Sequence, residues 1–190
     1  MVSVQEAAAA LHGAWRLARL DPRGLSYFNA SEEGFWRSFF AAVLCAPAYI
    51  LIAAIDLAQY PVATNDARFA AVHLIGYVIR WTAFPLAMTS VTRALGRETN
   101  YTRYIVARNW SNVLGVMVFL PAIALAAIGS SSMAILPLLA MILVLAYQWY
   151  IARIALAITG LQAAAVVGLD LLIDILTVSA TQALLPRTGG

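Results

Sequence analysis

Residues 133–152 read MAILPLLAMILVLAYQWYIA, a run of twenty residues without a charged side chain. A helix of about 20 apolar residues is long enough to cross the roughly 30 Å hydrocarbon core of a bilayer. Only Gly129-Ser130-Ser131-Ser132 separates this run from a second apolar run over 104–128. Two helices joined by so short a connection lie antiparallel. The sequence therefore predicts a hairpin of two membrane-spanning helices.

The composition extends this prediction to the whole chain of 190 residues. Hydrophobic residues make up 63% of it and charged residues 11%, whereas soluble domains are about 25% charged. We expect an all-α fold, a polytopic transmembrane bundle of five helices at about 39–58, 69–91, 104–128, 133–152 and 163–184. The bundle would occupy 31–185, after an N-terminal segment over 1–30 and before a short tail over 186–190.

Residues 4–20 predict an amphipathic helix that lies on the membrane interface rather than crossing it. At about 100° per residue, one narrow face is polar and comprises Gln5, His12, Arg16 and Arg19. The opposite face is apolar and comprises Val4, Ala8, Leu11, Trp15 and Ala18. A Trp opposite arginines suits an anionic lipid surface. The alternative is a cytosolic helix packed on the bundle.

The distribution of arginine predicts the orientation, because short cytoplasmic loops carry an excess of basic residues. The chain has no lysine, so all twelve basic residues are arginine. Eight of them fall before the first span, between the second and third spans, or at the end of the fourth. The other side holds only Arg68 and Arg187. We therefore expect a bacterial inner-membrane protein with a cytoplasmic N-terminus and a periplasmic C-terminus.

Charged residues at membrane depth are the strongest functional signal, because burying them in lipid is costly and they seldom lack a partner. Arg80 lies in the middle of the second predicted span, and Asp170 and Asp174 lie four residues apart in the fifth. With a rise of about 1.5 Å per residue, Arg80 and Asp174 lie at the same depth. We predict that these two residues bring the second and fifth spans into contact.

The same reasoning extends this polar centre to other spans. Asp170 lies one turn nearer the cytoplasm, where Arg108 of the third span or Arg153 of the fourth could meet it. The neighbouring polar residues expected to complete the hydrogen bonding are Asn109, Gln148 and Tyr150. Asp56 and Arg68 form a separate candidate pair near the outer surface.

Two roles for this centre remain open. In the first, its ion pairs fix which helices are neighbours and in what register, a role that often adds little net stability. In the second, Arg80, Asp170 and Asp174 line a polar path for protons, ions or a small anion. A dry ion pair would speak for the first role, and a connection to a water-accessible cavity for the second.

Known catalytic and cofactor motifs were not found. The chain lacks GxxxxGK[ST], HExxH and GxSxG, and its single cysteine, Cys45, allows no intrachain disulfide. His12 and His73 are predicted on opposite sides of the membrane, which argues against a haem or metal centre. The arginines are dispersed rather than clustered, which argues against nucleic-acid binding. We therefore expect a non-enzymatic protein without cofactor or metal.

Five spans, a cytoplasmic N-terminal segment and very short outer loops resemble the Yip1-domain family. The resemblance covers about 36–184 and includes proline-bearing segments such as Phe84-Pro85-Leu86 and Leu120-Pro121-Ala122. The Asp-Leu-Tyr-Gly-Pro motif of the eukaryotic members is absent, and the nearest text is Ala54-Ile55-Asp56-Leu57-Ala58. The similarity is thus closer to the bacterial members. It implies a membrane-organising or partner-binding role and carries over no site residue.

The sequence leads to two functional expectations. The first is an adaptor or scaffold in the bilayer, whose partners are lipid and other membrane proteins that it contacts laterally. The alternative is a small transporter or channel component that uses the intramembrane Arg/Asp centre.

Overall fold

The computed structural model describes residues 2–59, 62, 64–129 and 131–185, and helices dominate this part of the chain. The tail predicted at 186–190 lies outside the described residues. Within these residues, five helices are long and apolar enough to cross a membrane. They are α3 (Phe40–Gln59), preceded by the short α2 (Glu32–Ser38), then α4 (Asp66–Ala94), α5 (Tyr101–Ile128), α6 (Leu136–Leu156) and α7 (Gly160–Leu184). The predicted all-α fold with five candidate spans is confirmed.

Helices α4 and α7 each begin three residues before the predicted apolar run, because polar residues cap them. Asn65 accepts a hydrogen bond from the backbone N–H of Arg68, which starts α4 in front of its first apolar turn. Thr159 and Gln162 form a reciprocal capping box at the start of α7, a device that satisfies backbone donors at a helix N-terminus. Ser31 caps α2 as Asn65 caps α4, by accepting a hydrogen bond from the backbone N–H of Gly34.

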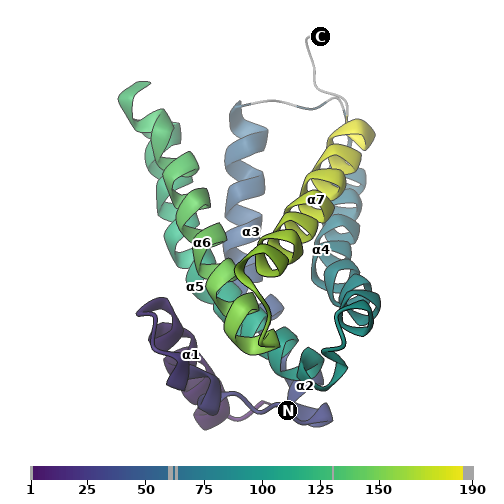
Figure 1. The fold of residues 1–190 in the computed structure, drawn as a ribbon. Helices are drawn as coiled ribbons and strands as arrows, with labels where there is room; N and C mark the ends of the chain where they lie inside the picture. The colour runs from purple at the N-terminus through teal and green to yellow at the C-terminus, as the bar shows by residue number, and fades with distance from the viewer. Residues whose placement is uncertain (1, 60–61, 63, 130, 186–190) are drawn as a thin grey trace.

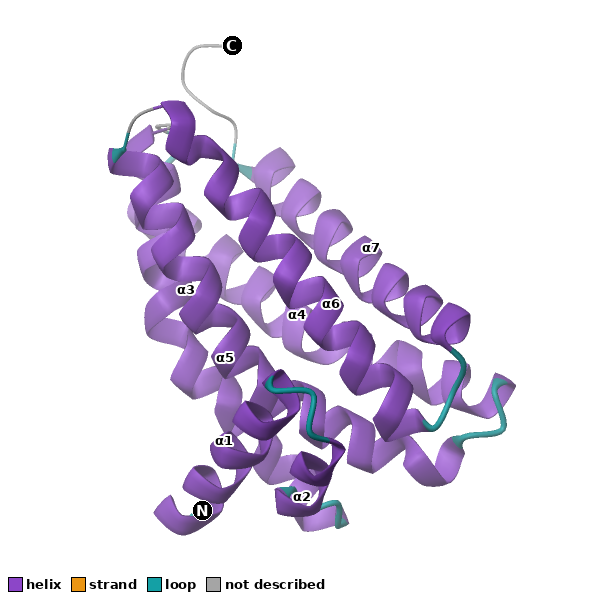
Figure 2. Ribbon diagram, turned by 60° about the vertical axis from the view of Figure 1, so that its left-hand side comes forward, coloured by secondary structure: helices purple, strands orange, loops and turns teal. Residues whose placement is uncertain are grey.

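Helix α5 occupies the centre of one end of the molecule and packs against α1 (Val4–Ala18), α2, α3 and α6. Helix α7 packs between α4 and α6. Figure 1 shows that the long helices converge at the end that carries α1 and α2 and diverge at the end where the C-terminus lies. We call these the packed end and the open end. Figure 2 shows α1 lying against the bundle at the packed end.

The hydrophobic core lies at the packed end. Its largest fully buried side chains include Phe84 and Met88 of α4, Tyr104 and Ile105 of α5, and Ile151 of α6. With the topology of five alternating spans, all five residues lie in the halves of their helices nearest α1. The outer surface stays apolar, as lipid contact requires, with exposed large side chains such as Leu74, Leu86, Leu143 and Leu172.

The N-terminal segment is folded against the bundle. Helix α1 and the short helix η1 (Pro22–Tyr27) meet so closely that a Cβ on Gly24 would stand 2.6 Å from the carbonyl oxygen of Gly13. Two tyrosines of α6 donate hydrogen bonds to this segment, Tyr147 to the carbonyl of Ala14 and Tyr150 to that of Leu20. An ion pair of 2.9 Å joins Glu6 of α1 to Arg37 of α2.

Helix α1 consequently has three faces rather than the two predicted. The face that packs on the bundle comprises Ala10, Gly13, Ala14 and Leu17, all buried. Val4 and Trp15 of the apolar face are exposed, by 86% and 56%, and the polar residues His12 and Arg19 are exposed beside them. The helix therefore packs on the bundle, as in the alternative prediction, and keeps an apolar face free for other contacts.

Candidate functional site

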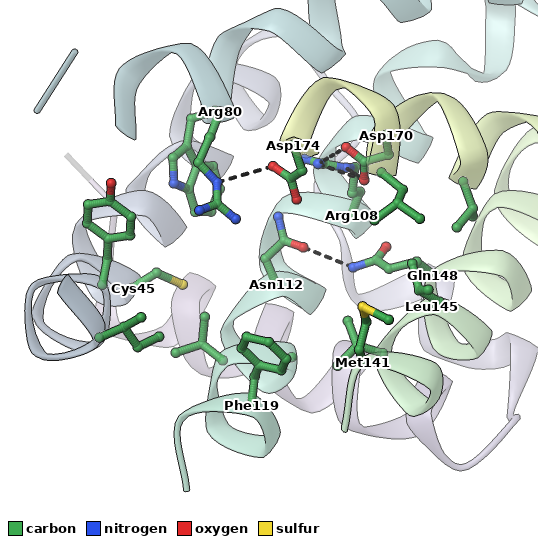
Figure 3. A pocket seen from close by; sticks show the side chains of 18 of the residues that line it. Cys45, Arg80, Arg108, Asn112, Phe119, Met141, Leu145, Gln148, Asp170 and Asp174 are labelled. Atoms are coloured by element: carbon green, nitrogen blue, oxygen red, sulfur yellow. Dashed lines mark hydrogen bonds and ion pairs between the residues drawn. The ribbon is translucent and has the colours of Figure 1, made fainter. Parts of the chain in front are cut away.

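A cavity of about 340 Å³ lies inside the bundle, and side chains from all five spans line it. Its volume is at the lower end of the range of about 300–1,000 Å³ typical of small-molecule sites. The charged residues of its wall are Arg80 of α4, Arg108 of α5, and Asp170 and Asp174 of α7. Figure 3 shows these charged side chains on one side of the cavity and Phe119, Met141 and Leu145 on the other.

The core at the packed end closes the cavity in that direction. The bundle on that side of the charged residues is filled by Phe84, Met88, Tyr104 and Ile151. Each of these side chains belongs to a residue that is at most 1% exposed. Access to the cavity therefore comes from the open end or laterally from the bilayer.

The first of the two ion pairs in the cavity wall is buried. Arg108 holds Asp170 through two nitrogens, with Nη2 at 2.6 Å from Oδ1 and Nε at 3.1 Å from Oδ2. Its guanidinium carbon stands 4.3 Å from the centre of the Phe84 ring, within the range of a cation–π contact. The two charged side chains are 6% and 18% exposed. A buried ion pair with two parallel hydrogen bonds is well suited to fix the position of α5 relative to α7.

The second ion pair is open to the cavity. Arg80 donates a single hydrogen bond of 3.1 Å from Nε to Oδ1 of Asp174. The two side chains are 35% and 40% exposed, although they belong to the middle of the bundle. Tyr49 of α3 lies on the other side of Arg80, with its ring centre 5.9 Å from the guanidinium carbon. This pair therefore keeps hydrogen-bonding groups of both charges accessible.

Two amides continue the polar side of the cavity. Gln148 of α6 donates a hydrogen bond of 2.9 Å from Nε2 to Oδ1 of Asn112 of α5, and Figure 3 shows both side chains below the ion pairs. Two buried atoms of this polar cluster, Arg108 Nη1 and Gln148 Oε1, have no hydrogen-bond partner among the described residues. One is a donor and the other an acceptor.

Aromatic side chains join α3 to α4 along the cavity. The hydroxyl of Tyr49 lies 3.1 Å from Nδ1 of His73, and the hydroxyl of Tyr77 donates a hydrogen bond of 2.6 Å to the carbonyl of Ala42. The rings of Tyr49 and Tyr77 are in contact, tilted by 38° with their centres 4.7 Å apart. Cys45 is 3% exposed and lies in the same wall.

The structure brings together most of the predicted polar centre. Arg80 contacts Asp174 as predicted, and of the two candidates for Asp170 it is Arg108 that forms the pair. Gln148 also lies in the cavity wall.

Three predicted members lie elsewhere, because matching residues by depth ignores their rotation about the helix axis. Asn109 follows Arg108 by one residue, about 100° further round the helix, and donates to Ser38 Oγ of α2. Tyr150 reaches Leu20, and the exposed Arg153 lies over the ring of Trp149. None of these three lines the cavity.

The proposed outer pair of Asp56 and Arg68 is a separate case. Arg68 donates a hydrogen bond of 2.9 Å from Nη2 to the carbonyl of Leu184, which joins the start of α4 to the end of α7. The contact between Asp56 and Arg68 stays a prediction.

Asn112 is the main residue that the sequence argument missed. It lies four residues after Arg108, hence on the same face of α5, and this spacing could have identified it in place of Asn109. Tyr49 and Tyr77 carry no comparable signal, because aromatic residues are common in membrane helices.

Among the described residues, no three His, Cys, Asp or Glu side chains are grouped so that they could hold a metal ion. Comparison with known proteins found no match among family models, curated proteins or solved structures. The chemistry of the cavity is therefore the basis for a functional proposal.

Proposed function

We propose that this chain is a multi-pass membrane protein that binds a small polar solute in its intramembrane cavity, as a small transporter or channel component. The observation that carries the proposal is the accessible Arg80–Asp174 pair in the cavity wall. Charged side chains within membrane helices typically line solute or ion pathways.

A contrast within the cavity supports this choice over a purely structural role. A pair that only joins two helices is best buried and bonded through two nitrogens, as Arg108 and Asp170 are. Arg80 and Asp174 have one hydrogen bond and more than a third of their side-chain surface exposed. Such a pair has groups left to contact a third partner.

The proposed orientation gives the cavity a direction. If the arginine-rich side is cytoplasmic, the packed end faces the cytoplasm and the open end faces the periplasm of a bacterial inner membrane. Solute would then enter from outside, and passage inward would require the core around Phe84 and Tyr104 to rearrange. Alternating closure around a site near the middle of the membrane is how many transporters work.

A second proposal keeps the adaptor or scaffold role that the Yip1-like topology implies. Its support is α1, which is held to α6 by Tyr147 and Tyr150 while its apolar face with Val4 and Trp15 is exposed. A helix with an exposed Trp and neighbouring arginine suits a membrane surface or a membrane-bound partner.

Thiol accessibility tests whether the cavity is aqueous, as a solute pathway requires. Val144 lines the cavity, whereas its neighbour Leu143, at the same depth on α6, is 58% exposed on the outer surface. Each is replaced by cysteine in a Cys45→Ala background, in the full chain reconstituted in vesicles. A charged, membrane-impermeant thiol reagent should label V144C and not L143C, because lipid excludes the reagent and disfavours the reactive thiolate.

Two results would overturn the proposal: no labelling of V144C, or equal labelling at both positions. The first would mean a cavity without water, and the second a reagent that ignores the two environments. Size-exclusion profiles that match those of the parent protein show that the variants are folded.

A further inference from the structure

We propose that the ligand of the cavity is a small zwitterionic amphiphile, with one anionic group, one cationic group a few bonds away, and an apolar body. This chemistry occurs in an α-amino acid with an apolar side chain and in the headgroup of a zwitterionic lipid. The inference rests on the proposed function, since it names the ligand class of the same cavity.

The charge balance of the wall is the first reason. Two arginines and two aspartates line the cavity, so its formal charge is zero. A ligand with a net charge would add an uncompensated charge within the bilayer, which is costly. A zwitterion adds no net charge and still interacts with charged side chains.

The second reason is that the two arginines differ in how many hydrogen-bond donors they have left for a ligand. Among the described residues, Arg108 gives both Nε and Nη2 to Asp170. Arg80 gives only Nε to Asp174, which leaves its Nη1 and Nη2 groups for a carboxylate or phosphate, the anions that a guanidinium binds through two nitrogens. Asp174 is 40% exposed and presents a carboxylate to an ammonium group. The anionic group thus belongs at Arg80 and the cationic group at Asp174.

The unpartnered buried atoms of the wall do not favour a ligand of one charge. Arg108 Nη1 lacks an acceptor, and Gln148 Oε1 lacks a donor. The deficit is balanced, one of each kind, so the wall as a whole favours neither an anion nor a cation.

The third reason is the separation of polar and apolar walls. Phe119 lies eleven residues beyond Arg108 on α5, about 16 Å along the helix, and Val116 and Val144 lie between them in the wall. Figure 3 shows the aromatic ring of Phe119 on the side opposite the ion pairs. A ligand with its charged groups at Arg80 and Asp174 would therefore place an apolar body against these side chains.

Four compounds with the same branched apolar body test the charge requirement. They are leucine as the zwitterion, leucinamide as the cation, 4-methylpentanoate as the anion and 4-methylpentanamide as the neutral form. Binding is measured by titration calorimetry on the full chain in nanodiscs of phosphatidylglycerol. Leucine should bind about tenfold more tightly, or better, than each of the other three.

Nanodiscs that contain phosphatidylethanolamine distinguish the two sources of a zwitterion. If the natural ligand is a lipid headgroup, this lipid should remain bound in native mass spectrometry and should prevent binding of leucine. If it is a free small molecule, leucine should bind equally in both nanodiscs. The inference is overturned if the cation, anion or neutral form binds best, or if neither leucine nor phosphatidylethanolamine binds.

Variants locate the site. Arg80→Gln and Asp174→Asn should each weaken zwitterion binding by about tenfold. The matched control is Arg93→Gln, which breaks an ion pair with Glu98 whose side chains are 76% and 62% exposed, and it should leave binding unchanged. Val144→Phe, which narrows the apolar side without touching a charge, should also weaken binding. If Arg80→Gln, Asp174→Asn and Val144→Phe all bind like the parent, the ligand is not in this cavity.

The thiol experiment separates the two proposals. Labelling of V144C without zwitterion binding would reject the ligand class and leave the solute-binding function standing. Absence of labelling would reject the function, and the ligand class with it.

Discussion

Arg80 and Arg108 line the same cavity, but their surroundings differ. We therefore expect them to contribute differently to the free energy of unfolding. Arg108 is 5% exposed as a residue and holds a largely buried carboxylate. Removal of one member of a buried pair leaves the other charge uncompensated, at a cost of about 3–5 kcal/mol. The side chains of the Arg80–Asp174 pair are more than a third exposed, so the loss of one partner leaves a less deeply buried charge.

We expect Arg108→Gln to lower the free energy of unfolding by about 3–5 kcal/mol. Arg80→Gln should lower it by about 1 kcal/mol or less, as for exposed ion pairs. Reversible unfolding in mixed micelles measures both values. Arg108→Met combined with Asp170→Leu should recover most of the loss, because apolar residues can replace a buried pair. Equal effects of the two single variants would contradict this assignment.

Asp21 provides a pH-dependent contact outside the membrane. Hydrogen bonds from Arg23 and Arg16 lower the pKa of the Asp21 carboxyl below its ordinary value. A lowered folded-state pKa means that the contribution of Asp21 to stability is present above the unfolded value of about 3.9. It is lost as the pH falls through the folded-state pKa.

A nitroxide spin label at Ser26 of η1, in a Cys45→Ala background, should therefore report constant mobility between about pH 6 and pH 8. Its mobility should rise as the pH falls below about 4. In Asp21→Asn, which removes the carboxylate, the label should already be mobile at pH 7. A variant with the same pH profile as the parent would show that another group is responsible.

At the scale of the elements, the contact of α1 with η1 depends on two glycines. A Cβ on Gly24 would stand 2.6 Å from the backbone oxygen of Gly13 and 2.9 Å from Cγ of Leu17. The backbone cannot rotate away as a flexible side chain could, so the two elements must separate.

Gly24→Ala should destabilise this contact by about 1–3 kcal/mol, the usual cost of overpacking. It should also increase proteolysis between 19 and 31 in the full chain. Gly168→Ala is the matched control, because a Cβ there meets nothing within 4 Å, and it should leave the cleavage rate unchanged. Resistance of Gly24→Ala to the protease would show that α1 and η1 are held together by other contacts.

The helices also show which structural features could be predicted from the sequence and which could not. Composition and long apolar runs predicted the five long helices. Helix rise alone predicted that Arg80 and Asp174 are neighbours. Rise gives depth but not rotation, so Asn109 was chosen where Asn112 lines the cavity. Rotation depends on packing, here on Ser38 of α2, which accepts the hydrogen bond of Asn109. The third face of α1 was missed for the same reason, since it exists only against the bundle.

At the scale of the whole molecule, the packed and open ends should differ in local stability. On α5, Tyr104–Trp110 are buried without a break, whereas Met117 and Val118 are 65% and 40% exposed. Regions with few buried contacts open at lower free energy.

Hydrogen exchange of the full chain in detergent micelles should therefore be slower over 104–113 than over 117–128. Helix α6 runs in the opposite direction along the bundle and supplies an internal control, with slower exchange over 148–156 than over 136–142. A uniform rate along both helices would contradict a difference between the two ends.

The placement of both cavity carboxylates on α7 has a consequence for biosynthesis. Arg80 and Arg108 leave the ribosome before Asp170 and Asp174, because the partners are 94 and 62 residues apart in the chain. An arginine at the centre of a helix costs about 2.5–3.5 kcal/mol on insertion, and α4, which carries one, is the least hydropathic of the five spans. The nascent protein thus holds two cations without their carboxylates until its last helix arrives. Arrival of α7 completes the charge balance of the cavity wall.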